Sequence, residues 1–387
     1  MDFELPTETR LLQDMVRRFV EEELLPLEGG ALAREARGEP LTPPRAELER
    51  LYAKAKNLGL VGLDVPKELG GAEIGAIAKI VITEEIARSI IPFAFPPDAP
   101  NLQMMLRTAN EDQRQRYVLP YARGETVSAI AISEPDAGSD PSRMKTRALR
   151  DGGGWVIEGR KLWISRVPEA EFTIVMAVTE PGRGSRGGIT AFIVDRGTSG
   201  MEVTRAMMVL GGYRTYEVVF DGCRVADAQV LGAVGQGFAP MQHRLTVRRL
   251  EMGAWSIGLA ERALEMMVGH SKARVTFGQP LAERQTVQWW IADATAKIHA
   301  ARLMTHEAAW RVERGEDVRT QASMVKVFAT EMASEVVDHA VQTFGAMGLV
   351  KEMPLQIMYQ LARAYRIMEG PSEVHRWVIA RKRLQAA

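Results

Sequence analysis

The sequence has one cysteine, Cys223, so no disulfide can form within the chain, and we expect a packed or loop thiol there. Lysine and arginine together number 49, as do aspartate and glutamate, so the formal net charge is zero. This balance argues against a nucleic-acid partner, which would favour a basic face. No apolar run approaches the roughly 18 residues of a membrane span, and the N-terminal residues lack a signal core. These absences predict a cytoplasmic protein with neither a membrane span nor a nucleic-acid partner.

Common nucleotide and metal motifs are also missing. The chain has no Walker loop, no GxGxxG after a strand, no GxSxG elbow and no HExxH. Its six histidines are scattered, with no i, i+4 pair, so no metal site is expected. An enzyme built on this chain would bind its cofactor without these fingerprints.

The texture of the sequence changes twice, which divides it into three parts. Residues 1–127 and 236–387 carry apolar side chains at helical spacing, whereas residues 128–235 form short β-branched runs separated by turns. No helix-length pattern separates those runs, so a β-α-β arrangement is not expected. We predict an α+β multidomain fold with a helical N-terminal domain, a middle antiparallel β barrel or sandwich, and a C-terminal four-helix bundle. The predicted helices include residues 7–25, 46–58, 75–89, 111–117, 245–271, 281–314, 321–344, 356–367 and 373–384.

Two motifs lie in the middle part. AISEPDAGSD, at residues 131–140, is a turn whose hydroxyls Ser133 and Ser139 point outward and can donate to a ring edge or a carbonyl. In GRKLWIS, at residues 159–165, strand alternation places Lys161, Trp163 and Ser165 on one face. An indole beside a hydroxyl suits a conjugated ring. Taken singly, an ordinary turn and a core tryptophan remain alternatives.

Two further motifs lie in the C-terminal part. RVTFG, at residues 274–278, precedes Gln285, and an arginine with an amide side chain suits a pyrophosphate and adenine. In YRIMEGPSEVH, at residues 365–375, Gly370 and Pro371 end a helix directly after Glu369. Apolar neighbours Ile367 and Met368 would partly desolvate the Glu369 carboxylate and favour its use as a base. A solvated glutamate at a helix end remains the alternative.

In this order and spacing, these segments resemble the acyl-CoA dehydrogenase family. The resemblance spans roughly residues 5–384 and also includes VPKELGG at residues 65–71 and QTFGAMG at residues 342–348. The EGPSEVH ending is similar to a less-studied branch of that family. The family fold has a helical N-terminal domain, a middle β domain and a C-terminal four-helix bundle.

The resemblance implies a cofactor, a substrate and a set of site residues. FAD would lie between the β domain and the bundle, with its far end at a neighbouring subunit. Glu369 matches the catalytic base, which removes the α proton of an acyl-CoA thioester while the β hydride passes to FAD. The FAD contacts implied by position are Ile132, Ser133, Trp163, Ser165, Arg274, Thr276, Phe277, Gln285, Gln342, Gly345, Ala346, Pro371 and Glu373. The substrate contacts implied are Ser139, Thr246, Arg249 and Gly370. The family further implies a homotetramer and an electron-transferring flavoprotein as electron acceptor.

Departures from the family pattern leave some roles open. A sub-branch places its base one residue before the arginine matched by Arg249, but here that residue is Arg248, so Glu369 is the matching candidate. Pro371 replaces a common threonine, and Thr246 stands where some relatives carry an acidic residue. The same scaffold serves acyl-CoA oxidases and flavin monooxygenases, and a catalytically silent FAD- or CoA-binding oligomer is the alternative from another class.

Overall fold

The N-terminal domain is helical in the computed structural model, which describes residues 4–97 and 99–385. Its α-helices are α1 (Thr7–Phe19), α2 (Glu28–Ala36), α3 (Arg45–Asn57), α4 (Ala76–Ile86), α5 (Asn101–Thr108), α6 (Glu111–Gln113) and α7 (Leu119–Ala122). The first predicted helix, residues 7–25, is regular only to Phe19 and continues as a π-turn over Val20–Leu24. Pro26 lacks an N–H to continue the ladder, so the helical pitch changes just before it.

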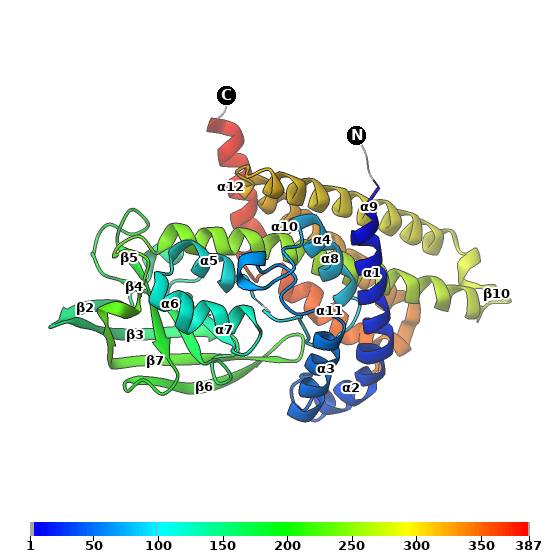
Figure 1. The fold of residues 1–387 in the computed structure, drawn as a ribbon. Helices are drawn as coiled ribbons and strands as arrows, with labels where there is room; N and C mark the ends of the chain where they lie inside the picture. Colours follow the sequence, from blue (N-terminus) through cyan, green and yellow to red (C-terminus); the bar gives the residue numbers. More distant parts are fainter. Residues whose placement is uncertain (1–3, 98, 386–387) are drawn as a thin grey trace.

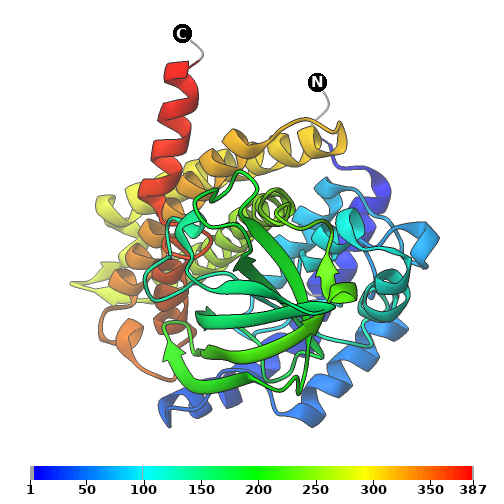
Figure 2. The same cartoon turned by 90° about the vertical axis from the view of Figure 1, so that its left-hand side faces the viewer.

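The middle domain is a curved sheet, seen from its side of the molecule in Figure 2. Its strands are β1 (Ser128–Ala131), β2 (Arg147–Asp151), β3 (Gly154–Ile164), β4 (Phe172–Val178), β5 (Ile189–Asp195), β6 (Met201–Val209), β7 (Tyr213–Ala226) and β8 (Val230–Leu231). They follow the order β6-β7-β3-β2-β4-β5-β8, with β1 beside β4. Most pairings are antiparallel as predicted, but β4 pairs parallel with both β1 and β2. Such pairings join strands across long connections, which local turn patterns do not reveal.

The C-terminal domain is a bundle of long helices. Its elements are α8 (Phe238–Ala273), β9 (Val275–Thr276), β10 (Gln279–Pro280), α9 (Gln285–Glu313), α10 (Arg319–Phe344), α11 (Pro354–Tyr365) and α12 (Ser372–Gln385). Helix α8 begins seven positions earlier than predicted, because Pro240 lies in its first turn, where a missing N–H costs nothing. The β9–β10 hairpin projects from the end of the bundle farthest from the sheet (Figure 1).

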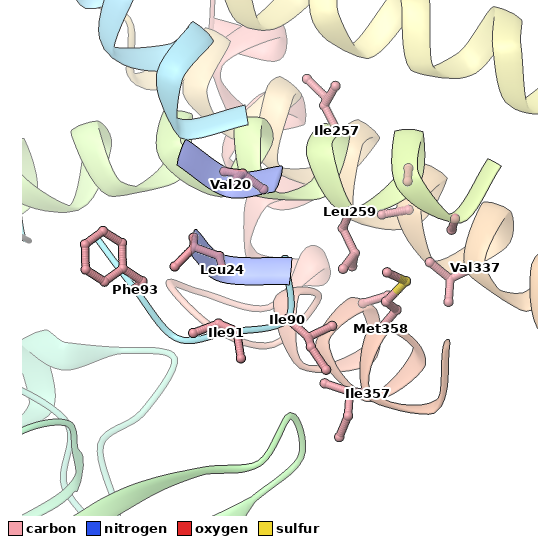
Figure 3. Packing of buried hydrophobic residues seen from close by; sticks show 14 of the residues in the cluster. Val20, Leu24, Ile90, Ile91, Phe93, Ile257, Leu259, Val337, Ile357 and Met358 are labelled. Atoms are coloured by element: carbon pink, nitrogen blue, oxygen red, sulfur yellow. The ribbon is translucent and has the colours of Figure 1, made fainter. Parts of the chain in front are cut away.

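The N-terminal domain and the bundle share one hydrophobic core (Figure 3). Leu24 and Phe93 come from the N-terminal domain, whereas Ile257, Val337 and Met358 come from three bundle helices. These side chains are nearly inaccessible to solvent, and burying each contributes about 1.5–3 kcal/mol. The bundle therefore presents a fixed surface to the other two domains.

The loop at residues 210–213 joins all three domains. Its Gly211 N–H donates to Gln360 Oε1 of α11 at 3.1 Å, and its Gly212 carbonyl accepts from Leu41 N–H at 2.8 Å. A Cβ on Gly211 would lie 2.5 Å from Leu361, and one on Gly212 would lie 2.5 Å from Leu41. Only glycine permits these approaches, since both residues also have positive φ.

Two expectations about special features can be followed in the fold. Cys223 is buried in the sheet, and burial raises the pKa of its thiol to about 11, so it is an inert packed thiol as predicted. Along residues 4–97 and 99–385, no helix is long and apolar enough to cross a membrane.

Candidate active site

Glu369 lies in the turn between α11 and α12, in a left-handed backbone conformation. Its φ is +57°, which is uncommon for a residue with a side chain. The next residue, Gly370, has φ +100°, and a Cβ there would lie 2.9 Å from His375 Nε2. Helix α11 already ends at Tyr365, so the prediction that Gly370 and Pro371 end it directly after Glu369 was wrong, and these two residues instead fix the direction of the backbone within the turn.

Two side chains hold the Glu369 carbonyl. Arg249 Nε donates to it at 3.1 Å, and His375 Nε2 lies 3.1 Å from it. Burial, together with the positive charge of Arg249, lowers the pKa of His375 to about 4, so the ring is neutral at pH 7. A carbonyl can only accept, so Nε2 carries the proton, and the unprotonated Nδ1 lies 3.1 Å from Ser323 Oγ. These bonds offset the cost of the left-handed conformation.

The Glu369 carboxylate faces an arginine. Its Oε2 lies 3.3 Å from Arg244 Nη1, and the two side chains are 17% and 8% exposed. Arg244 is fixed from behind, because its Nε donates to Asn101 Oδ1 at 3.1 Å. Asn101 in turn donates to Ser128 Oγ at 3.0 Å. The carboxylate is therefore largely removed from solvent, and it lies beside the positive charge of Arg244.

The apolar neighbours behave differently from the sequence prediction. Ile367 is 55% exposed and does not enclose the carboxylate. Met368 is partly buried, and its sulfur accepts from the Tyr213 hydroxyl at 3.0 Å. Burial and then the negative charge of Glu369 raise the pKa of Tyr213 to about 12, so this hydroxyl stays protonated. Expecting both neighbours to shield Glu369 was wrong because consecutive residues of a turn point in different directions.

The two motifs of the middle domain lie side by side. The Ser133 carbonyl accepts from Leu162 N–H at 2.8 Å, which places the AISEPDAGSD turn beside β3. Strand alternation predicted Lys161, Trp163 and Ser165 on one face, and this was wrong for Lys161. It is fully buried, and its Nζ donates to the Ile132 carbonyl at 3.0 Å and to Glu134 Oε1 at 2.9 Å. The register of β3 shifts between Lys161 and Ile164, and this irregularity turns Trp163 outward.

Trp163 is the exposed aromatic of this region. Its indole is 52% exposed and its φ is +65°, so a strained backbone presents an apolar ring to solvent. Ser165, two positions further along the chain, is also exposed. Because a flat ring system would cover the indole and meet the hydroxyls, these residues fit the isoalloxazine ring of FAD. This is where the sequence places the flavin ring.

The remaining residues near this end are less uniform. Ser139 is exposed on its turn, and Glu373 is exposed on α12. Pro371 is half-buried, and its carbonyl accepts from His375 N–H at 3.3 Å. Thr246 is buried, and its hydroxyl donates to the Gln242 carbonyl of its own helix at 3.0 Å. Contact of Thr246 with CoA therefore stays a prediction that requires this hydroxyl to change partner.

The other predicted FAD contacts lie at the far end of α8. They are Arg274, Thr276, Phe277, Gln285, Gln342, Gly345 and Ala346. His270 and Phe344 stack at 4.1 Å, which brings the end of α10 beside the base of the hairpin. Arg249 and Arg274 are separated by 25 positions of one helix, or about 37 Å at 1.5 Å per residue. The structure thus gathers these residues together but keeps them away from Glu369.

Phe277 is the most distinctive member of this second group. Its side chain is 99% exposed at the tip of the hairpin, with φ +48°. The hairpin is held by a backbone bond and a side-chain bond: the Arg274 carbonyl accepts from Leu281 N–H at 2.8 Å, and the Thr276 carbonyl accepts from Arg284 Nη2 at 2.6 Å. A rigid hairpin that carries an exposed phenyl ring fits a contact supplied to another subunit.

Several residues of the site were not singled out from the sequence. Arg244, Asn101 and Lys326 come from three different helices. Lys326 is fully buried and donates to the Arg366 carbonyl at 2.9 Å, and burial lowers its pKa to about 8. The one local signal was the recurrence of arginine at positions 244, 248 and 249 of a single helix. Across residues 4–97 and 99–385, no group of three His, Cys, Asp or Glu side chains could hold a metal ion.

Comparison with known proteins identifies the family. Three family models match the chain: the acyl-CoA dehydrogenase N-terminal domain over residues 6–125, the middle domain over residues 129–223 and the C-terminal domain over residues 235–384. The chain belongs to the acyl-CoA dehydrogenase family. The family resemblance and the three-part fold are therefore confirmed, while the exact domain boundaries at 127/128 and 235/236 stay predictions.

Individual relatives agree with this family. An (R)-benzylsuccinyl-CoA dehydrogenase from Thauera aromatica is 42% identical over 99% of this chain and 97% of its own. The structure of a putative acyl-CoA dehydrogenase from Mycobacterium abscessus superposes with a TM-score of 0.91 at 32% identity, covering 99% of this chain and 100% of that one. An FAD complex of PigA superposes with a TM-score of 0.90 at 27% identity, covering all of both chains. Acyl-CoA dehydrogenases are FAD-dependent oxidoreductases, and FAD is the cofactor of this family.

Proposed function

We propose that this chain catalyses the α,β-dehydrogenation of an acyl-CoA thioester, with Glu369 as the base. The observation that carries the proposal is the state of Glu369. Its carboxylate is removed from bulk water and its backbone is held by Arg249 and His375. Its amide N–H meets no acceptor in the described part of the chain. One fixed residue thus offers both a proton acceptor and a hydrogen-bond donor.

These two groups suit the two demands of the reaction. The carboxylate takes the α proton, and a positioned base typically contributes ~10²–10⁴-fold. The amide N–H donates to the thioester oxygen as negative charge develops there, which is worth about 3–4 kcal/mol in comparable sites. FAD, when bound, accepts the β hydrogen with its electron pair. Because the turn is fixed before substrate arrives, the carboxylate and the N–H are already in position for the reaction.

The residues proposed to hold FAD come from two subunits. Ile132, Ser133, Trp163 and Ser165 would surround the flavin ring, with Pro371 and Glu373 nearby. Arg274 of a neighbouring subunit would neutralise the pyrophosphate, with the other residues of the hairpin end around the adenosine. The separation of about 37 Å along α8 supports this division, since it places the two groups of residues at opposite ends of the helix. Ser139, Thr246, Arg249 and Gly370 would meet the acyl-CoA.

We further propose a homotetramer that passes electrons to an electron-transferring flavoprotein. Large apolar side chains remain exposed on the bundle, at Trp289 and Trp310 of α9, Phe328 of α10 and Trp377 of α12. Exposed aromatic residues spread over several helices are typical of subunit interfaces. An acceptor protein would take electrons from the reduced flavin without oxygen.

Anaerobic mixing with a panel of acyl-CoA thioesters tests the function. At least one thioester should bleach the flavin absorbance, and the α proton of that thioester should exchange with D₂O, as followed by NMR. When air is admitted, the reduced flavin should be reoxidised only slowly. Rapid reoxidation would instead select an oxidase, and FAD-loaded enzyme that neither bleaches nor exchanges the α proton with any thioester would contradict the proposal.

A further inference from the structure

Three arginines crowd the Glu369 end of α8. Arg244, Arg248 and Arg249 fall within six positions of one helix, and the side chains of Arg244 and Arg248 are only 8% and 12% exposed. A guanidinium cannot lose its proton in a protein, so its burial is costly unless a carboxylate or several acceptors pair with it. Each of these side chains therefore requires partners that offset its burial.

Only Arg248 is paired with a carboxylate other than that of the proposed base. Arg248 Nη1 pairs with Glu251 at 2.7 Å, and its guanidinium lies 5.0 Å over the Trp255 ring. Arg249 donates through Nε to the Glu369 carbonyl, which fixes its place against the backbone of the turn. Arg244 is different, since the carboxylate it meets is that of the proposed base. Its Nη2 has no acceptor among residues 4–97 and 99–385.

The pairing of Arg244 cannot last through the reaction. When Glu369 takes the α proton, its carboxylate becomes neutral, and Arg244 is left as a buried cation. Glu251 cannot replace it, because Glu251 is already bonded to Arg248. The negative charge lost by Glu369 would pass to FAD with the hydride, and a neutral acyl chain itself brings no anion to Arg244. Leaving one partner of a buried pair uncompensated is the expensive case, whereas a bidentate carboxylate on the ligand removes that cost.

We propose that the acyl group of the substrate carries a free carboxylate, which Arg244 binds through Nη1 and Nη2. The substrate class is the CoA monothioester of a dicarboxylic acid. This inference rests on the proposed dehydrogenation at Glu369. Because Arg244 lies directly against the base, the carboxylate lies within a few carbons of the bond that is oxidised. Asn101 fixes Nε from behind, so the two Nη groups are the ones presented to the ligand.

A matched pair of ligands isolates the charge. Succinyl-CoA and glutaryl-CoA are compared with their methyl esters, which keep the chain but lose the negative charge. Binding is measured by calorimetry on FAD-loaded Glu369→Gln, so that turnover does not interfere. The acid of at least one pair should bind about 10- to 100-fold more tightly than its ester, as expected for charged hydrogen bonds in a desolvated site.

Variants of Arg244 locate the preference. In the same background, Arg244→Met should bring acid and ester to equal affinity, while Arg244→Lys should keep part of the preference through its single charge. Arg45→Met, at a side chain 93% exposed on α3, should change neither affinity. FAD content of each variant shows that it has folded, and the lysine variant serves if the methionine variant does not fold.

The outcomes separate this inference from the proposed function. Equal affinity of acid and ester in both pairs, or a preference that survives Arg244→Met, overturns the carboxylate site. Flavin bleaching of the unmodified enzyme by neutral thioesters as fast as by acids does the same and leaves the dehydrogenation intact. Tight, Arg244-dependent binding of an acid without flavin reduction by any thioester supports the carboxylate site and contradicts the proposed function.

Discussion

The two ends of helix α8 present opposite kinds of surface. At the Glu369 end, Arg244 and Arg249 are largely buried and bonded within the chain. At the hairpin end, Phe277 is fully exposed and Arg274 is exposed as well. The first end is enclosed within one chain, whereas the second presents its side chains to solvent. One helix thus belongs to two different sites, and mutations at its ends should fail in different ways.

Removing the carboxylate of Glu369 should have the largest effect on chemistry. Glu369→Gln should reduce flavin reduction by acyl-CoA by ~10²–10⁴-fold while FAD stays bound, because the base is lost but the fold is not. Rapid mixing under nitrogen measures this rate. Glu352→Gln, at an exposed turn, is the control and should behave like the unmodified enzyme.

Glu251 offers a way to break this assignment. Its carboxylate is bonded to Arg248, so it is not free to take a proton from substrate. Near-normal flavin reduction in Glu369→Gln together with its collapse in Glu251→Gln would move the base to α8.

A charge at the hairpin tip should act on assembly rather than chemistry. Phe277→Asp should lower both the mass measured by light scattering and the FAD bound per subunit, because a buried interface would have to desolvate the carboxylate. In an isolated chain, the same change at an exposed site would alter the free energy of unfolding by only about 0.5 kcal/mol. Leu149→Asp, at a half-exposed side chain of β2, is the matched control. An unchanged mass and FAD content in Phe277→Asp would remove the hairpin from the cofactor site.

Gly370 tests whether the Glu369 turn is as rigid as its contacts indicate. Gly370→Ala would place a Cβ 2.9 Å from His375 Nε2 at φ +100°, so the free energy of unfolding should fall by about 1–3 kcal/mol and flavin reduction should slow. Gly269→Ala, near the C-terminal end of α8 with open space around it, should instead raise stability by about 0.5–1 kcal/mol. Thermal unfolding compares them, and equal effects would mean that the turn tolerates a side chain.

His375 should make the stability of the chain depend on pH. Its pKa is about 4 in the folded chain against the ordinary 6.5. On acidification the unfolded state therefore takes up a proton first, so stability is present above pH 6.5 and is lost as the pH falls towards 4. The loss is up to about 1.4 kcal/mol per pH unit for one such group. His375→Gln should flatten part of this slope in denaturant titrations, and parallel slopes would contradict the neutral ring. His306, with a pKa also near 4, remains in the variant and contributes to the slope that persists.

The sequence predicted the domains and most helices because their signals are local. Apolar spacing located α9, α10 and α11 to within a few residues, and Gly370 with Pro371 located the turn at Glu369. It missed the early start of α8, where Pro240 lies in the first turn, and it missed the parallel partners of β4. Both depend on contacts or positions that a local pattern does not encode.

The site was predicted only where one residue type carries the chemistry. Glu369 and Arg249 could be named from the motif, but Arg244, Asn101 and His375 act through contacts between distant segments. Arg244 meets Glu369 across 125 positions and Asn101 across 143. Trp163 was expected on the right strand, yet its exposure comes from a register shift in β3 that alternation cannot foresee.

The glycine loop at residues 210–213 makes the three domains mechanically interdependent. It is pinned to Leu41 in the first domain, to Gln360 in the third, and through Tyr213 to Met368, one residue from the base. Separating any one domain from the others would break the hydrogen bonds that this loop makes. Heat or denaturant should therefore melt the chain in a single cooperative step, and the flavin signal should report the loss of the whole molecule at once.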